Sequence, residues 1–152
     1  MSTNSRIYLK LKEEDKNKIA KANKDNIKLN VFVFETPTIT LDNDYISVYC
    51  HWDGYIKGGV GESLFKYHTE YDKILNMLLF GYLSFITYDE IRPYYAWRGE
   101  KEEPWEYVKP NLTNDTKLSE SYDYLFDYQT NKWYVRCKET NKKWEDLENY
   151  IS

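Results

Sequence analysis

The sequence predicts an α+β domain, a mainly antiparallel sheet of about four to six strands with about two or three helices packed on one side. Runs rich in β-branched and aromatic residues recur at 29–35, 45–52, 122–127 and 132–138, which is typical of strands. One apolar stripe between 71 and 82 has helical spacing. Clusters of glycine, proline, Asp and Asn separate these runs, as turns do in a compact fold.

The composition indicates one folded domain. Of the 152 residues, 41% are hydrophobic and 18% aromatic, which argues against general disorder. The net charge of −4 does not favour generic binding to a nucleic-acid backbone. No run approaches the roughly 18 apolar residues of a membrane span, so no membrane partner is predicted. Cys50 and Cys137 each lie in a predicted strand and are expected to be reduced core thiols of a cytosolic protein.

The first part of the chain is basic. Residues 6–28 carry eight Lys/Arg against four Asp/Glu. Ile7, Leu9 and Leu11 alternate with other residues and predict a short strand, and the lysine-rich stretch after them fits a weak helix or a mobile arm. We therefore divide the chain into a basic N-terminal arm or extension, 1–28, and a single α+β domain, 29–152.

The elements of the domain follow in order. Residues 29–35 (LNVFVFE) are the clearest strand, ended by Pro37, and 38–41 fit an edge strand. A central strand is predicted at 45–52. A helix comes later, because apolar side chains recur at helical spacing before Gly81, a residue suited to ending it. The stripe of this helix consists of Tyr71, Ile74, Leu75, Leu78, Leu79 and Tyr82.

Beyond this helix the pattern weakens. Three prolines interrupt residues 87–116, where we expect short strands and a long loop. The runs 122–127 and 132–138 predict a β-hairpin. The tail, 139–151, is predicted to be helical, because three apolar residues recur there at helical spacing.

The most informative segment is 46–64, ISVYCHWDGYIKGGVGESL, in which a strand leads into a glycine loop and then into a helix start. Main-chain N–H groups at a helix N-terminus lack partners and can bind an anion. One interpretation is therefore a nucleotide or phosphate site on which aromatic rings stack a base, although the loop matches no phosphate-binding motif. The other is a tight turn. The ligand-binding residues of the first interpretation are Trp52, Tyr55, Lys57, Gly58, Gly59, Gly61, Ser63 and Arg98.

Catalytic and metal sites have little support. His51 and Asp53 share one face of a continuing strand, where a carboxylate can orient a histidine for acid–base chemistry. No nucleophile accompanies them, because Cys50 points to the opposite face. The histidines and cysteines lack metal-ligand spacing, although the acidic stretch offers oxygen atoms for a hard cation. We predict no catalytic residue, no bound metal and no cofactor.

A second candidate surface lies in the acidic part of the chain. Residues 88–127 carry ten Asp/Glu against five Lys/Arg, and aromatic residues alternate with charges there. Tyrosine, tryptophan and arginine dominate the binding energy of many protein interfaces; ordinary surface packing is the alternative. The predicted partner-binding residues are Tyr94, Tyr95, Trp97, Glu100, Glu102, Glu103 and Trp105.

Three motifs, HWDGY at 51–55, GVGESL at 59–64 and YDYLFDYQTNKWYV at 122–135, resemble a family of small proteins encoded by bacteriophages and prophages. The likeness covers 46–83 and 122–135, and this chain departs from it by one additional residue in the loop at 56–58. The family has no established reaction, so the resemblance carries over no catalytic residue. It implies an accessory gene of a mobile element acting in a bacterial cytoplasm, and such accessory proteins frequently antagonise host defence.

Three functions follow as hypotheses. The leading one is a non-enzymatic phage or prophage protein that antagonises a bacterial defence system, as anti-CRISPR proteins do, by binding a host protein or nuclease complex. The alternative is a sponge-like module that binds a nucleotide through the 58–63 loop. The third is an enzyme that uses His51 and Asp53. A homodimer is a further candidate, because exposed strands and aromatic side chains favour self-pairing.

Overall fold

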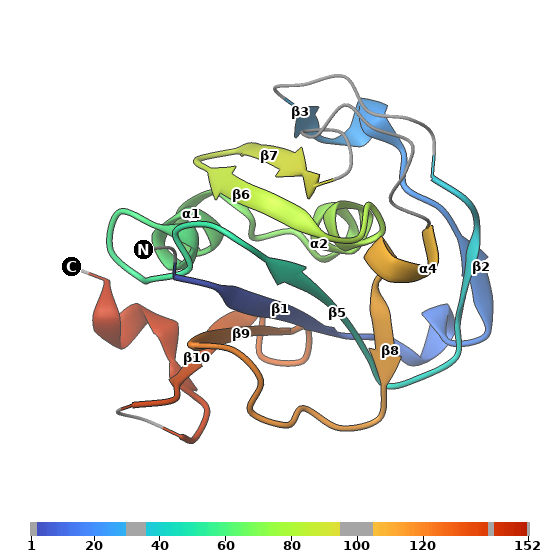
Figure 1. The fold of residues 1–152 in the computed structure, drawn as a ribbon. Helices are drawn as coiled ribbons and strands as arrows, with labels where there is room; N and C mark the ends of the chain where they lie inside the picture. Colours follow the sequence, from blue (N-terminus) through green and yellow to red (C-terminus); the bar gives the residue numbers. More distant parts are fainter. Residues whose placement is uncertain (1–2, 30–35, 95–104, 140–141, 152) are drawn as a thin grey trace.

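The computed structural model describes residues 3–29, 36–94, 105–139 and 142–151. Within these ranges the chain forms an α+β fold with a nine-stranded sheet, a separate two-stranded sheet and three α-helices (Figure 1). The order along the large sheet is β11 (Glu145–Asp146), β10 (Lys132–Cys137), β9 (Tyr122–Asp127), β1 (Ser5–Lys10), β5 (Tyr45–Cys50), β6 (Leu83–Thr87), β7 (Glu90–Pro93) and β3 (Lys28–Leu29), with β8 (Asn111–Thr113) paired to β5.

The α+β class is confirmed, but the large sheet is mixed. Strand β1 pairs in parallel with β9, β5 with β6, and β3 with β7, while the other pairs are antiparallel. The prediction of a mainly antiparallel sheet of about four to six strands was therefore too simple. Parallel neighbours need long crossover connections and carry no turn between them, so local sequence patterns do not reveal them.

Strand β1 occupies the middle of the large sheet. Its register places Ile7 opposite Val48 of β5 and opposite Tyr124 of β9. Ile7 and Leu9 are fully buried. The short strand predicted from the alternation is confirmed, and these residues belong to the core of the fold and not to an arm.

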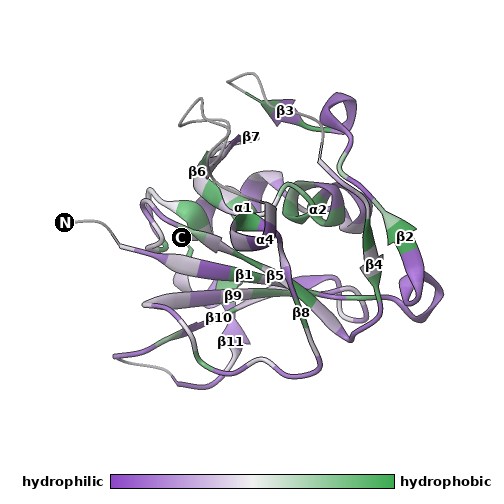
Figure 2. Ribbon diagram, turned by 45° about the vertical axis from the view of Figure 1, so that its right-hand side comes forward, coloured by the Kyte–Doolittle hydropathy of each residue, from purple (hydrophilic) through white to green (hydrophobic). Residues whose placement is uncertain are grey.

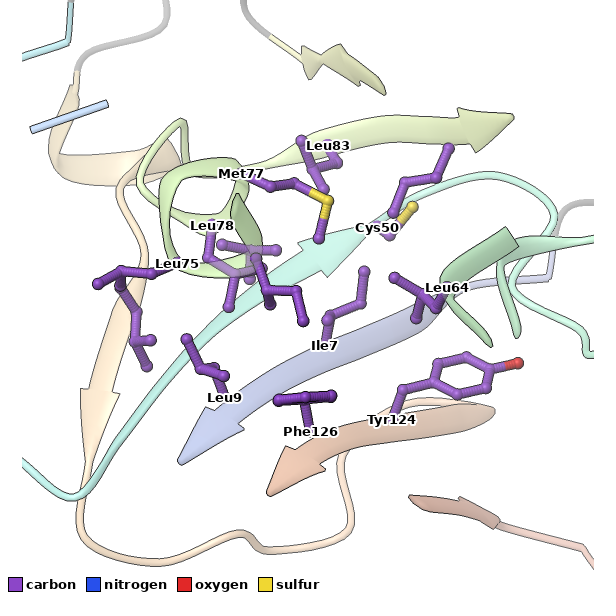
Figure 3. Packing of buried hydrophobic residues seen from close by; sticks show 14 of the residues in the cluster. Ile7, Leu9, Cys50, Leu64, Leu75, Met77, Leu78, Leu83, Tyr124 and Phe126 are labelled. Carbon is purple, nitrogen blue, oxygen red and sulfur yellow. The ribbon is translucent and has the colours of Figure 1, made fainter. Parts of the chain in front are cut away.

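Two helices cover one face of the sheet. Helix α1 (Val60–Tyr67) packs on β6 and β10, and α2 (Tyr71–Leu78) packs on β1 and β5. Figure 3 shows Ile7, Leu9 and Leu64 pointing into the space between these helices and strands. Figure 2 shows hydrophobic residues gathered on α2. The helix predicted from the apolar stripe is confirmed, with its buried face toward the sheet. The chain leaves it through Gly81, which has a φ of +83°.

The remaining short elements lie around this core. Strands β2 (Lys18–Ala20) and β4 (Ile39–Leu41) form the two-stranded sheet, which confirms a strand at 38–41. The strand predicted at 29–35 is represented only by β3, because residues 30–35 lie outside the described residues. The third α-helix, α4, and three short 3-10 helices complete the fold: Trp105–Val108, Glu13–Asp15, Lys24–Asn26 and Leu147–Tyr150. No helix among the described residues has the length and apolar content of a membrane span.

The C-terminal hairpin is present, but the predicted tail helix is not. Strands β9 and β10 pair antiparallel, as expected. After them, β11 adds to the edge of β10, and a 3-10 helix follows over Leu147–Tyr150. Trp144 does not contribute to a helical stripe, because its ring packs 4.2 Å from the guanidinium carbon of Arg136. The helix prediction at 139–151 was wrong because these contacts with β10 outweigh local spacing.

The face of the sheet away from the helices carries a row of charges. Arg6, Asp123 and Arg136 are cross-strand neighbours on β1, β9 and β10. Arg136 Nε lies 3.2 Å from Asp123 Oδ2, and both side chains are buried. The Asp123 carboxylate also accepts the main-chain N–H groups of Ser119 at 2.9 Å and Glu120 at 3.1 Å. Burial raises the pKa of Asp123, and these donors and Arg136 oppose that effect.

Candidate functional site

The glycine loop begins where β5 ends. The main-chain N–H groups of His51 and Trp52 donate to the carbonyls of Leu83 and Ser84, at 3.0 Å and 2.8 Å, so the loop starts against β6. Asp53 then takes a left-handed backbone conformation, with a φ of +56°. This conformation is tolerated better by Asp and Asn than by most other residues, and it turns the chain back toward the start of α1.

The loop supplies its own caps to helix α1. The first three helical N–H groups, of Val60, Gly61 and Glu62, donate to loop carbonyls at 2.8, 3.2 and 2.8 Å; the acceptors are Asp53, Tyr55 and Ile56, respectively. The N–H of Gly58 donates to Glu62 Oε1 at 2.9 Å. These donors would have to bind the anion of a phosphate site. Because they already have partners within the chain, the loop has the architecture of a self-capped turn.

Two glycines are required by close packing inside this turn. A Cβ atom on Gly59 would lie 2.5 Å from the carbonyl oxygens of Asp53 and Tyr55. A Cβ on Gly61 would lie 2.8 Å from the hydroxyl oxygen of Tyr124, which itself donates to the Gly54 carbonyl at 2.6 Å. The glycine pattern is therefore explained by contacts between the loop, the helix and β9.

The other predicted ligand residues that the structure describes differ in their exposure to solvent. Trp52 and Tyr55 are exposed, each with a relative accessibility of 38%, and Lys57 is also exposed. Ser63 is buried, and its hydroxyl accepts the main-chain N–H of Tyr88 at 3.1 Å. Arg98 lies outside the described residues.

A pocket of about 210 Å³ opens beside the loop. We call it the glycine-loop pocket, and its walls come from the loop, from α1, from the end of β6 and from the turn between β6 and β7. The lining residues are Asp53, Gly58, Gly59, Glu62, Ser63, Lys66, Tyr67, Ile86, Thr87 and Tyr88.

Tyr67 and Tyr88 line the pocket and remain largely exposed, at 48% and 63%. Their ring centroids are 5.6 Å apart and the rings are nearly perpendicular, at 89°. Trp52 and Tyr55 are exposed on the adjoining loop, although neither of them lines the pocket itself. We call these four residues the aromatic rim. Tyr67 and Tyr88 were not predicted as site residues, because neither stands in a motif and their exposure follows from tertiary packing.

Two side chains hold the main chain of Tyr88, one through its N–H group and one through its carbonyl oxygen. Its N–H donates to Ser63 Oγ, and its carbonyl oxygen lies 2.9 Å from Nε2 of His68, which donates to it. The φ of Tyr88 is +55°, a strained value for a bulky side chain. His68 is buried, and this burial lowers the pKa of its imidazole. Two polar side chains of the α1 region thus fix an exposed ring at the pocket edge.

Only some of the charged side chains that line the pocket form ion pairs. Glu62 Oε2 lies 2.7 Å from Lys66 Nζ, an ion pair that lowers the pKa of Glu62. The carboxylate of Asp53 has no hydrogen bond or ion pair to any other described residue. Among the charged residues that line the pocket, Asp53 is therefore the one outside an ion pair, and the positive charge of nearby Lys57 also lowers the pKa of Glu62.

The predicted catalytic pair does not form an acid–base unit with a nucleophile. The Nδ1 atom of His51 lies 3.0 Å from the Tyr49 hydroxyl, and its ring packs against Trp52 at 4.5 Å. The neighbouring thiol of Cys50 is fully buried, which raises its pKa to about 12. A thiol in this state is not a nucleophile at neutral pH. Neither cysteine forms a disulfide; Cys50 lies in the core as expected, whereas Cys137 is only half-buried. Among the described residues no cluster of His, Cys, Asp and Glu could hold a metal ion.

The predicted partner surface is described at two positions only. Tyr94 is half-buried, its N–H donates to the Tyr82 carbonyl at 2.8 Å, and its ring packs on Tyr82. Trp105 is half-buried at the start of α4. The residues of this surface that lie outside the described part of the chain are Tyr95, Trp97, Glu100, Glu102 and Glu103.

Together, the fold and the site define a class: an α+β protein with an aromatic-rimmed, acidic pocket beside a self-capped glycine loop. Comparison with protein-family models, with curated proteins and with solved structures finds no match to this chain.

Proposed function

We propose that this chain is a non-enzymatic binding protein that holds a protein partner through its aromatic rim. The observation that carries the proposal is the exposed, fixed pair Tyr67–Tyr88. Tyrosine and tryptophan bury much apolar area while keeping a polar edge, and they are enriched among the residues that dominate interface energies. Because Ser63 and His68 already hold the main chain of Tyr88, little backbone freedom is lost there on binding.

The nucleotide-binding alternative has less support. The N–H groups at the start of α1 have partners inside the chain, and so does the hydroxyl of Ser63. In the adjoining pocket Glu62 is paired with Lys66, and the remaining carboxylate, that of Asp53, repels a phosphate group. An anionic ligand would therefore meet unfavourable charge and no main-chain cradle.

The biological setting of the proposal rests on the resemblance to phage-encoded proteins. We propose that the partner is a bacterial defence protein or nuclease complex, and that binding antagonises it. The net charge of −4 and the acidic pocket suit a basic partner surface, such as one that binds nucleic acid.

A matched pair of variants tests the proposal. The double variant Tyr67→Ala/Tyr88→Ala removes the exposed pair, and Tyr107→Ala removes an equally exposed tyrosine on α4, outside the pocket. Each tagged protein is expressed in bacterial strains that carry one defence system each. Phage plating is measured, and co-purified polypeptides are identified by mass spectrometry.

We expect wild type and Tyr107→Ala to retain the same host polypeptide and to restore phage plating. The double variant should lose both while keeping its circular dichroism spectrum. A folded double variant that retains the polypeptide and the plating phenotype would overturn the proposed role of the rim.

A further inference from the structure

The glycine-loop pocket has the chemistry of a cation site. Of the charged residues that line it, Glu62 and Lys66 form an ion pair, whereas Asp53 forms none with the described residues. The attraction between a cation and an exposed carboxylate is modest in water. It becomes stronger when atoms of a bound protein exclude water from around the pair.

The two tyrosines add a second, independent feature. Both rings line the pocket, and they meet edge to face at an angle of 89°. The face of an aromatic ring carries negative electrostatic potential and attracts ammonium and guanidinium groups within about 6 Å. Carboxylate and ring faces therefore favour the same sign of charge.

The size of the glycine-loop pocket limits which chemical group can occupy it. The pocket volume of about 210 Å³ is smaller than the roughly 300–1,000 Å³ of typical small-molecule sites. It suits the end of one long side chain better than a nucleotide.

The main chain that carries two of the wall residues is also fixed before binding. The Asp53 carbonyl accepts the Val60 N–H at 2.8 Å, which ties this residue to α1. Tyr88 is held by Ser63 and His68. Little ordering is therefore required when a cation enters.

From this geometry we infer that the glycine-loop pocket receives a basic side chain, arginine or lysine, of the protein partner. Asp53 pairs with its charge, and Tyr67 and Tyr88 contact it through their ring faces. This inference rests on the proposed function and specifies the chemistry of the partner at that site.

Short peptides test the inference without the natural partner. Acetylated, amidated Gly-X-Gly peptides with X = Arg, Lys, Gln or Glu are titrated into ¹⁵N-labelled protein, and amide chemical shifts are followed by NMR. We expect the Arg and Lys peptides to shift the signals of Gly58, Thr87 and Tyr88, and their relative Kd values show which cation is preferred. The Gln and Glu peptides should leave these signals unchanged.

Two charge-matched variants sharpen the test. Asp53→Asn removes the carboxylate, and asparagine tolerates the positive φ at this position, so the loop is preserved. Asp42→Asn removes an exposed carboxylate elsewhere. We expect Asp53→Asn to weaken binding of the cationic peptides about fivefold, in the range of a partly exposed ion pair, and Asp42→Asn to leave it unchanged.

The inference is overturned if the cationic peptides shift no pocket signal, if the Gln peptide shifts the same signals equally, or if the two variants bind alike. The proposed function can survive such a result. It fails separately, when Tyr67→Ala/Tyr88→Ala still retains the host polypeptide.

Discussion

The imidazole Nε2 of His68 lies 2.9 Å from the carbonyl oxygen of Tyr88, so a buried histidine holds the backbone of the most exposed ring in the aromatic rim. Since a carbonyl can only accept, Nε2 carries the proton, and the neutral imidazole is sufficient for the bond. The indole of Trp133 donates to the main-chain carbonyl of His68 at 2.8 Å, which anchors the histidine to β10. The position of the rim is thereby linked to the core.

This contact predicts a pH dependence of stability. Burial lowers the pKa of folded His68, while an unfolded histidine has a pKa of about 6.5. Above that value His68 is neutral in both states, and its contribution is complete. As the pH falls below about 6.5, the unfolded chain binds a proton that the folded chain resists, so the free energy of unfolding decreases.

Urea unfolding at about pH 7.5 and about pH 5.5 measures this effect against the His68→Gln variant. Glutamine can donate to the Tyr88 carbonyl without titrating. The wild type should lose more stability than the variant between the two pH values. Equal losses would show that His68 does not contribute to the dependence.

A second prediction concerns the strained backbone of Tyr88. Glycine adopts a φ of +55° without strain, so the substitution removes a backbone strain of about 1 kcal/mol from the folded state. It also loses the contact with Tyr67, worth about 0.5 kcal/mol, and it gains unfolded-state entropy. We expect Tyr88→Gly to change the free energy of unfolding by less than about 1 kcal/mol while abolishing partner binding. A large loss of stability would mean that the ring serves the fold instead.

A third prediction concerns the anchor of the glycine loop. Tyr124→Phe removes the buried hydrogen bond to the Gly54 carbonyl and should destabilise the protein by about 1–3 kcal/mol, because the carbonyl loses its donor. Tyr134→Phe makes the same chemical change at an exposed bond to Thr130 and should cost less than about 0.5 kcal/mol. Chemical denaturation of both variants makes the comparison. Similar values for the two would contradict the anchoring role.

A fourth prediction concerns the charged row on the far face of the sheet. Arg136→Met leaves the buried carboxylate of Asp123 without its cation and should destabilise by about 3–5 kcal/mol. Lys132→Met breaks an exposed pair with Asp146 and should destabilise the protein far less. Thermal unfolding ranks the two variants. The reverse order would show that the row does not stabilise the sheet.

The sequence predicted those elements whose signals are local. Alternation revealed β5 and the β9–β10 hairpin, and the apolar stripe revealed α2. The central position of β1 depends on parallel pairing with β9 at the other end of the chain, for which local patterns hold no signal. The helix predicted at 139–151 was wrong for a related reason. Contacts of this segment with β10 outweigh the helical spacing of its apolar residues.

The candidate site shows the same division. The glycine loop could be located, but the sequence could not show that the carbonyls of Asp53, Tyr55 and Ile56 already accept the N–H groups of α1. Tyr67 and Tyr88 are brought together only by the packing of α1 against the β6–β7 turn. The abundance of aromatic residues predicted a contact surface, but it did not show where on the fold that surface lies.

The most direct test of the aromatic rim as the contact surface is site-specific photo-crosslinking in bacterial cells. A photoreactive phenylalanine analogue is placed at position 88 in one protein and at the equally exposed position 107 in another. We predict that position 88 captures a discrete host polypeptide and that position 107 does not. Capture of the same polypeptide with equal yield from both positions, or of none from position 88, would contradict the account.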